Sequence, residues 1–453
     1  MKKYFTSYWI RSAFYTFLQR FSLTFFGLIN FMILIRSLSH TQMGVWALFL
    51  IVTSIFETTK SGLIKNAHIR FVSITGNTTE KTAVASSSLI INALISLVFI
   101  LFLLFFSNLL RSVLRTEIEL TQMLLWFIPG LISMIFFSHL EAIQQSHLDF
   151  KGVFAGHFSR QVIFFIIILA HFILKIPFSL VHLALYQGAS IILGTVVLYF
   201  YSKKYILHVF NPNIKLVKKI LSYGSYILGS GVISNIAANV DQFMISRYVS
   251  TGAVAYYNTA SRINLLVDIP SYAASEIIFP KASVAMAEEG IPKIKYLYER
   301  MVAILLCFTT PAALIIILFP KLVIWVIAGS AYFAAAPILQ LYMCTGILRP
   351  MQNQAANILN SIGKQSTCFV MNTLTLLSNL IVNYICLVNF GFYGAALGTL
   401  ITLTFSSIAW YFIMKKLIGL QLKNILVYMG QFYRSIPARF FNSRNKNSAS
   451  DLP

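Results

Sequence analysis

Twelve apolar segments constrain the fold of this chain more than any other feature. Each contains about 20 mostly apolar residues, the length that a helix needs to cross the hydrocarbon core of a bilayer. They lie at approximately 14–35, 43–63, 83–106, 120–139, 153–173, 178–201, 223–246, 253–279, 301–319, 332–360, 366–388 and 393–414. Only 11% of the 453 residues are charged, against roughly 25% in an average soluble chain. The sequence therefore excludes a water-soluble fold and predicts an all-α polytopic membrane protein with about 12 transmembrane helices.

Lysine and arginine are distributed unequally between the two sides of these segments. With the N-terminus inside, the inside segments hold 25 Lys and Arg residues and the outside loops hold six. Cytoplasmic loops of membrane proteins carry such an excess, so both termini are expected in the cytoplasm. The formal net charge of +22 thus has a topological explanation, and nucleic acid is not expected as a partner.

The two halves of the chain resemble each other. The run Arg36–Ser39, at the end of the first segment, is similar to Arg247–Ser250 at the end of the seventh, at an offset of 211 residues. The runs Tyr199–Lys204 and Tyr411–Lys416 close the sixth and twelfth segments at an offset of 212. Because each half has six spans, the repeats are parallel, and the seam between them is the expected place for a central cavity.

This repeat predicts the domain organisation. We expect an N-terminal six-helix lobe (1–201), a cytoplasmic connector (202–222), a C-terminal six-helix lobe (223–414) and a basic cytoplasmic tail (415–453). The two lobes would be parallel and would surround the central cavity. The tail has apolar residues interleaved with basic ones, so it is expected to form an interfacial helix followed by disorder.

Several motifs resemble the polysaccharide flippases of the multidrug, oligosaccharidyl-lipid and polysaccharide exporter superfamily. The resemblance spans about residues 12 to 414. It is carried by Asn239–Arg247, Tyr256–Arg262, Ile278–Pro280, Gly346–Pro350, Asn360–Lys364 and Phe390–Ala396, together with Leu38-Ser39 and Gly44. The predicted number of helices, twelve, resembles that of O-antigen and capsule flippases more than that of peptidoglycan-precursor flippases.

The resemblance implies transport by alternating access. The expected cargo is a lipid-linked, polyprenyl-pyrophosphate oligosaccharide, carried across the bacterial inner (plasma) membrane for a surface polysaccharide such as capsule or the O-antigen of lipopolysaccharide. Membrane lipids and other polysaccharide-assembly proteins are the further partners that the resemblance implies. The chain would be a transporter and not an enzyme.

Four arginines lie within the predicted spans: Arg262, Arg349, Arg20 and Arg160. An arginine at the centre of a bilayer costs about 2.5 to 3.5 kcal/mol on insertion scales, so each is expected to face protein or water. In the functional interpretation they line the central cavity and bind the pyrophosphate and acidic sugars through bidentate hydrogen bonds. In the structural interpretation they pair with acidic residues and hold helices together. The candidate partners are Asp241, Asp268, Glu57 and Glu276.

The carboxylates of Asp241 and Asp268 also suit a coupling ion, H⁺ or Na⁺, because neighbours set the protonation of a carboxylate in a low dielectric. No other cofactor is expected. The eight histidines and four cysteines lack metal-ligand spacing, and no glycine loop followed by Lys-Ser or Lys-Thr predicts a nucleotide. No catalytic residue and no metal site are therefore predicted.

Two other functions stay open. An ion-coupled multidrug exporter of the same superfamily should have an acidic and aromatic cavity, against which the four arginines argue. A membrane glycan polymerase or ligase should have a long outside loop with catalytic residues, and no such loop is found between the predicted segments.

Overall fold

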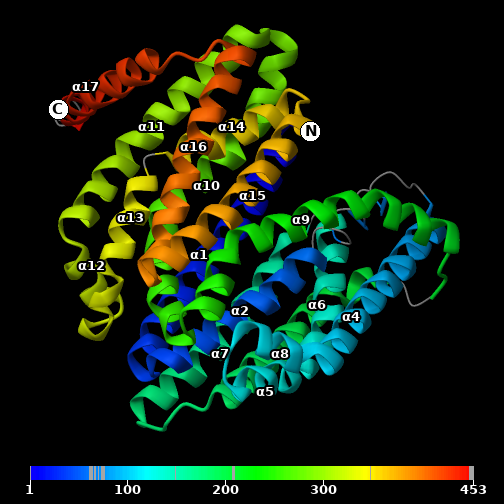
Figure 1. Ribbon diagram of the computed structural model, residues 1–453. Helices are drawn as coiled ribbons and strands as arrows, with labels where there is room; N and C mark the ends of the chain where they lie inside the picture. The colour runs from blue at the N-terminus through cyan, green and yellow to red at the C-terminus, as the bar shows by residue number, and fades with distance from the viewer. Residues whose placement is uncertain are drawn as a thin grey trace. The chain divides into compact units, whose positions relative to one another are not determined.

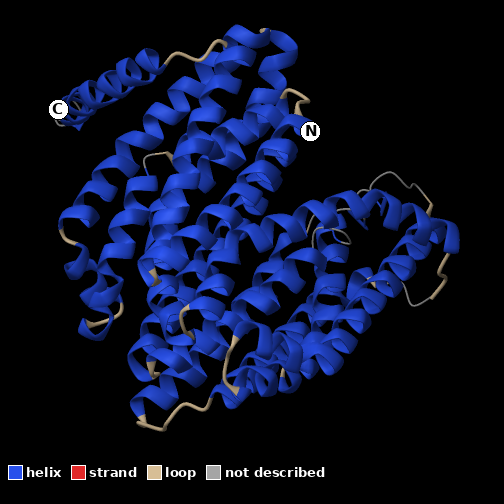
Figure 2. Cartoon of the chain, viewed as in Figure 1, coloured by secondary structure: helices blue, strands red, loops and turns tan. Residues whose placement is uncertain are grey.

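The computed structural model describes residues 2–60, 65, 68–69, 71–72, 77–147, 149–206, 210–346 and 348–447. Throughout these ranges the regular structure is helical, without a strand (Figure 2). An all-helical fold follows from the medium, because a spanning helix satisfies all its backbone hydrogen bonds internally in lipid. The predicted fold class is confirmed to this extent.

The chain consists of two compact units, Met1–Ala255 and Tyr256–Pro453, whose helices are labelled in Figure 1. The first unit contains α1 (Lys2–Ser37), α2 (His40–Lys60), α4 (Thr78–Leu114), α5 (Ile118–Trp126), α6 (Ile128–Ser146), α7 (Phe150–Ile173), α8 (Leu180–Ser202), η2 (Lys203–Tyr205) and α9 (Ile214–Tyr248). Helix α10 (Thr251–Glu288) begins in the first unit and continues into the second. The second unit also contains α11 (Gly290–Leu318), α12 (Pro320–Ile327), η3 (Ser330–Ala335), α13 (Ala336–Gly346), α14 (Arg349–Ser361), α15 (Gln365–Phe390), α16 (Phe392–Ile418) and α17 (Leu422–Asn447).

Eight helices of the described residues are long and apolar enough to cross a membrane. They are α1, α2, α4, α7, α8, α11, α15 and α16, and each overlaps one of the predicted segments. The number is ten if two bent helix pairs each count as one span. The two remaining predicted segments, 223–246 and 253–279, lie in α9 and α10. Twelve spans in two six-helix lobes therefore stay a prediction.

Proline explains where the two bent pairs break. Helices α5 and α6 meet at 44°, and Pro129 lies in the first turn of α6. Helices α13 and α14 meet at 45°, and Pro350 lies in the first turn of α14. Since proline has no backbone N–H and its ring clashes with the preceding turn, a continuous helix is interrupted at both places. The predicted segment 332–360 is thus two helices rather than one.

Small residues allow close helix packing in both units. In the first unit a Cβ atom added to Gly194 of α8 would lie 2.9 Å from the carbonyl oxygen of Gly156 on α7. In the second unit a Cβ atom on Gly394 of α16 would collide with the carbonyl of Cys386 on α15. Both helix pairs therefore approach at backbone distance, the role that small residues have in membrane helices.

Helix α9 belongs to the first unit. Its Ser246 hydroxyl donates to the carbonyl of Leu114 at 2.6 Å, and the helix packs against α2 and α4. The predicted division into lobes 1–201 and 223–414, with a connector at 202–222 between them and a tail at 415–453, stays a prediction. The tail residues through Asn447 contain helix α17, which contacts α11 through the Tyr433 hydroxyl and the carbonyl of Cys307 (2.8 Å).

Candidate substrate site

Arg349 lies at the break between α13 and α14, where it is the first residue of α14. Its Nη1 atom donates to Oδ2 of Asp268 on α10 at 2.7 Å. The Asn264 orientation that satisfies both side chains turns the amide oxygen toward Arg349, where it accepts from Nη2 at 3.0 Å. The Tyr342 ring lies 5.4 Å from the guanidinium carbon. Three neighbours from two helices thus hold the guanidinium of Arg349, whose side chain is 18% exposed.

Asp268 is the more deeply buried partner of this pair. It is 2% exposed, and its Oδ1 atom has no hydrogen-bond partner among the described residues. Helix α14 is further attached to α10 by Gln354, whose amide donates to the Ser271 carbonyl at 3.1 Å and to the Ser275 hydroxyl at 3.2 Å. The polar residues Asn264, Asp268, Ser271 and Ser275 follow one another at helical spacing, so they form one face of α10.

Arg262 also lies on α10 but on a different part of its surface. The side chain is half-buried, and its Nε atom donates to Oδ1 of Asn258, one turn earlier, at 3.0 Å. Successive residues of an α-helix are separated by 100°, which directs the Asn258 and Arg262 pair away from the Asp268 face. The second unit therefore holds Arg262 and Arg349 in different local environments.

The other two predicted arginines belong to the first unit. Arg160 of α7 donates from Nη1 to Oε1 of Glu57 on α2 at 3.0 Å, and the two side chains are 11% and 42% exposed. Arg20 of α1 is exposed. Of the remaining predicted acidic residues, Asp241 on α9 is 7% exposed, whereas the side chain of Glu276 lies outside the described residues.

Arg160 and Arg349 therefore have ion pairs of the kind expected in the structural interpretation, Arg160 with Glu57 and Arg349 with Asp268. These contacts explain why burial of both arginines is tolerated. Substrate binding by Arg262, Arg349, Arg20 and Arg160 stays a prediction, as does ion coupling at Asp241 or Asp268.

A polar cluster in the first unit was not predicted. Glu141 of α6 is 9% exposed and pairs with Lys65 at 2.9 Å. Its Oε1 atom also lies 3.4 Å from Nε2 of His157 on α7. The sequence places Glu141 in a short loop segment, and a distance of 76 residues separates it from Lys65. In the sequence, this cluster is indicated only by His157, a histidine inside an apolar segment.

The side chain of His68 is 1% exposed and lies between the candidate spans His40–Thr58 and Thr78–Leu114. Burial, together with the smaller electrostatic effects of His139 and His147, lowers the pKa of His68 to about 3. An unfolded histidine has a pKa of about 6.5, so between about pH 6.5 and 3 the unfolded chain binds a proton that the folded chain does not. Stability is therefore complete above this window and falls as the pH decreases through it.

We expect a His68→Gln variant to lose part of this acid sensitivity. At about pH 5 the histidine should cost the native protein about 2 kcal/mol. Thermal unfolding in detergent, compared between neutral pH and about pH 5, should show a smaller decrease in Tm for the variant than for the native chain. His182→Gln, at an exposed position of α8, is the control and should keep the full decrease. Equal decreases for all three proteins would contradict this assignment.

Comparison with known proteins shows similarity in both sequence and fold. The family model described as polysaccharide biosynthesis protein matches residues 9–286. The chain is 27% identical over 231 residues to an uncharacterized membrane protein of Methanocaldococcus jannaschii, covering 50% of this chain and 45% of the relative. It is 21% identical over 197 residues to "Probable low-salt glycan biosynthesis flippase Agl15" of Haloferax volcanii, covering 44% and 42%. The chain thus spans about half or less of the length of the curated relatives it matches.

Two solved structures cover almost the whole chain. The lipid II flippase MurJ in an inward closed conformation has a TM-score of 0.76 at 19% identity, covering 92% of this chain and 90% of that one. An inward-facing multidrug resistance MATE transporter of the MOP superfamily has a TM-score of 0.76 at 15% identity, covering 88% and 94%. These likenesses establish the fold. The proteins with a named activity are flippases and transporters rather than enzymes, in agreement with the prediction from the sequence.

Proposed function

This chain belongs to the polysaccharide biosynthesis protein family, and we propose that it moves a lipid-linked oligosaccharide between the leaflets of a bacterial plasma membrane. The cargo would carry a polyprenyl-pyrophosphate anchor and serve a surface polysaccharide such as capsule or the O-antigen of lipopolysaccharide. Transport would proceed by alternating access of the two predicted lobes. Membrane lipids, and proteins that assemble the polysaccharide, are the proposed partners.

The observation that carries this proposal is the position of Arg349 at a helix break. Helix α14 begins at Arg349, inside a predicted span. The N-terminus of a helix carries a partial positive charge, and transporters direct such half-helix ends at anionic groups of their substrates. The guanidinium at the same place has the planar donor geometry that suits phosphate oxygens, and in this structure it is paired with Asp268. Both features favour an anionic cargo over a cationic one.

The rival function, ion-coupled export of cationic drugs, has one observation in its favour. Asp241 and Asp268 are buried carboxylates, 7% and 2% exposed. A buried carboxylate can take up a coupling ion or contact a cation. In this chain, however, Asp268 is already paired with Arg349, which reduces the negative charge available to a cationic drug.

Depletion of the protein tests the proposal. Cells that lack it should accumulate the lipid-linked oligosaccharide on the inner leaflet, and expression of the native chain should remove this accumulation. Accessibility of the sugars to an impermeant lectin on inside-out vesicles measures the distribution. An unchanged distribution together with increased sensitivity to cationic drugs would support the rival function instead.

The proposed orientation predicts the sidedness of cysteine labelling. Single cysteines at Lys203 and Lys295 should react with an impermeant maleimide only from the cytoplasmic side, and one at Ser112 only from outside, because 25 of the Lys and Arg residues lie on the assigned inside. The four native cysteines are first replaced by serine. Labelling of positions 295 and 112 from the same side would contradict the twelve-span topology.

A further inference from the structure

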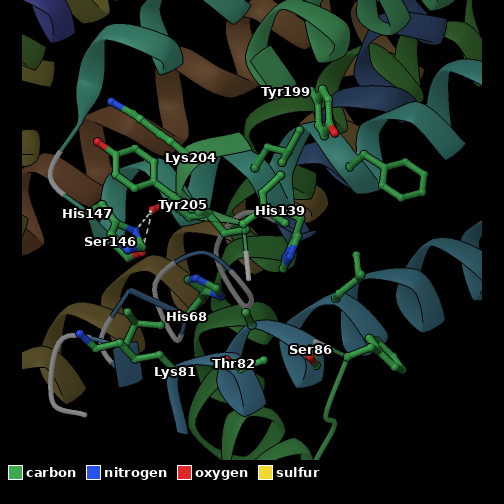
Figure 3. A pocket seen from close by; sticks show the side chains of 18 of the residues that line it. His68, Lys81, Thr82, Ser86, His139, Ser146, His147, Tyr199, Lys204 and Tyr205 are labelled. Carbon is green, nitrogen blue, oxygen red and sulfur yellow. Dashed lines mark hydrogen bonds between the residues drawn. The ribbon is translucent and has the colours of Figure 1, made fainter. Parts of the chain in front are cut away.

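A cavity of about 700 Å³ lies within the first unit (Figure 3). It is formed by the first turns of α4, the last turns of α6 and the end of α8, with His68 and Val72 closing one side. Helix α6 packs against both α4 and α8. The volume is in the range of pockets that hold small organic ligands. The four predicted cationic-site arginines are absent from its lining, so the cavity differs from the proposed transport site.

One end of the cavity is basic. Lys81 of α4 and Lys204 of η2 lie there, together with His147 and Tyr205, whose rings stack with centroids 4.5 Å apart (Figure 3). Lys204 contacts Oδ2 of Asp149 at 3.0 Å, whereas Lys81 has no carboxylate partner among the described residues. The described residues that line the cavity include no Asp or Glu. Glu80 precedes Lys81 in the first turn of α4 and Asp149 pairs with Lys204, but neither carboxylate lines the cavity, so the charged side chains that line this end are cationic.

Two buried histidines add unused hydrogen-bonding capacity. His68 is 1% exposed and His139 is 9% exposed, and their rings meet edge to face with centroids 5.8 Å apart. The Nδ1 atoms of both rings have no hydrogen-bond partner among the described residues. Both rings face the cavity in Figure 3. Because a buried polar atom without a partner is unfavourable, a ligand with acceptor oxygens would be stabilised at this place.

The opposite end of the cavity is apolar and open. Phe136 of α6 and Val196 of α8 line it, and these side chains are 52% and 45% exposed. Phe136 precedes Ser146 by ten residues on α6, about 15 Å along the helix axis. The lining thus changes from apolar to basic over a distance that corresponds to half of the hydrocarbon core. In the proposed orientation the basic end lies at the cytoplasmic ends of the helices.

We propose that this cavity binds an anionic lipid of the cytoplasmic leaflet. The phosphate group would lie between Lys81, Lys204 and the two buried histidines, and the chain would lie against Phe136 and Val196. The basic end discriminates against a zwitterionic lipid, because the cationic part of such a headgroup would be repelled by the lysines. The placement in the cytoplasmic leaflet depends on the proposed orientation, whereas binding itself depends on neither glycan transport nor topology.

Native mass spectrometry of the full chain in detergent tests the proposal. The protein is titrated at neutral pH with phosphatidylglycerol and with phosphatidylcholine of the same acyl chains. We expect phosphatidylglycerol to bind about tenfold more tightly at the first site. The Lys81→Ala, Lys204→Ala double variant should lose this preference. Lys203→Ala is the matched control, since Lys203 is adjacent and exposed but does not line the cavity, and it should keep the preference.

A second variant separates the cavity from surface charge. Ala85 lines the cavity, and Ala85→Phe should fill it, so phosphatidylglycerol binding should decrease although no charge changes. Equal binding of both lipids to the native chain, or an unchanged preference in both the lysine double variant and Ala85→Phe, would overturn the proposal. Complete displacement of phosphatidylglycerol by millimolar inorganic phosphate would also overturn it, because the site would then bind a soluble anion.

Discussion

Arg262→Ala is expected to abolish glycan export while the protein stays folded and inserted. The arginine is half-buried within α10 and donates to Asn258, so its removal leaves a neutral amide without one partner. We propose that its guanidinium contacts the phosphates of the cargo. Arg262→Lys should keep partial activity, because a point charge survives without the planar pair of donors.

Surface glycan, quantified in cells that produce each variant as the sole copy, gives the measurement, and size-exclusion chromatography of the purified protein reports folding. Arg36→Ala, at an exposed position at the end of α1, is the control and should export normally. The double variant Arg262→Met, Asn258→Leu distinguishes substrate contact from a structural hydrogen bond, since replacing both partners of a hydrogen bond by apolar groups can be nearly neutral. Native export by that double variant would show that Arg262 is structural.

Arg349→Met is expected to destabilise the protein by about 3 to 5 kcal/mol, because it leaves a buried charge without its partner. Asp268 is 2% exposed, and Arg349 is its ion-pair partner. The double variant Arg349→Met, Asp268→Leu should recover most of the lost stability, since replacement of both partners by apolar residues removes the buried charge. Thermal unfolding in detergent measures both effects.

The Arg160 and Glu57 pair is the matched control for this experiment. It has similar geometry, with Nη1 and Oε1 3.0 Å apart, but the Glu57 side chain is 42% exposed and can be hydrated after Arg160→Met. The expected loss is therefore small, about 1 kcal/mol or less. An Arg349→Met protein as stable as Arg160→Met would contradict a bracing role for the Asp268 pair. Export by the stable Arg349→Met, Asp268→Leu protein would show that Arg349 is not needed for the cargo.

The sequence predicts that Arg349 and Arg160 lie within membrane-spanning segments, but it does not predict which carboxylate pairs with each of them. The depth of Arg349 follows from its place in a long apolar segment. The choice of Asp268 as its partner joins residues 81 positions apart, and the choice of Glu57 for Arg160 joins residues 103 positions apart. Four acidic residues were candidates for either arginine, and no local pattern distinguishes among them.

The sequence by itself determined that this chain is helical and spans a membrane, because the length of an apolar segment and the energetic cost of unpaired backbone groups in lipid are local properties. It also identified the four arginines as candidate functional residues, since a charged residue within an apolar segment can be recognised without knowledge of its neighbours in the fold. Only the tertiary structure decided which helices pack together, where a predicted span breaks at Pro350, and that His68 and His139 meet beside Lys81. These features depend on contacts between residues that are distant in the chain, and such contacts are selected by the packing of whole helices.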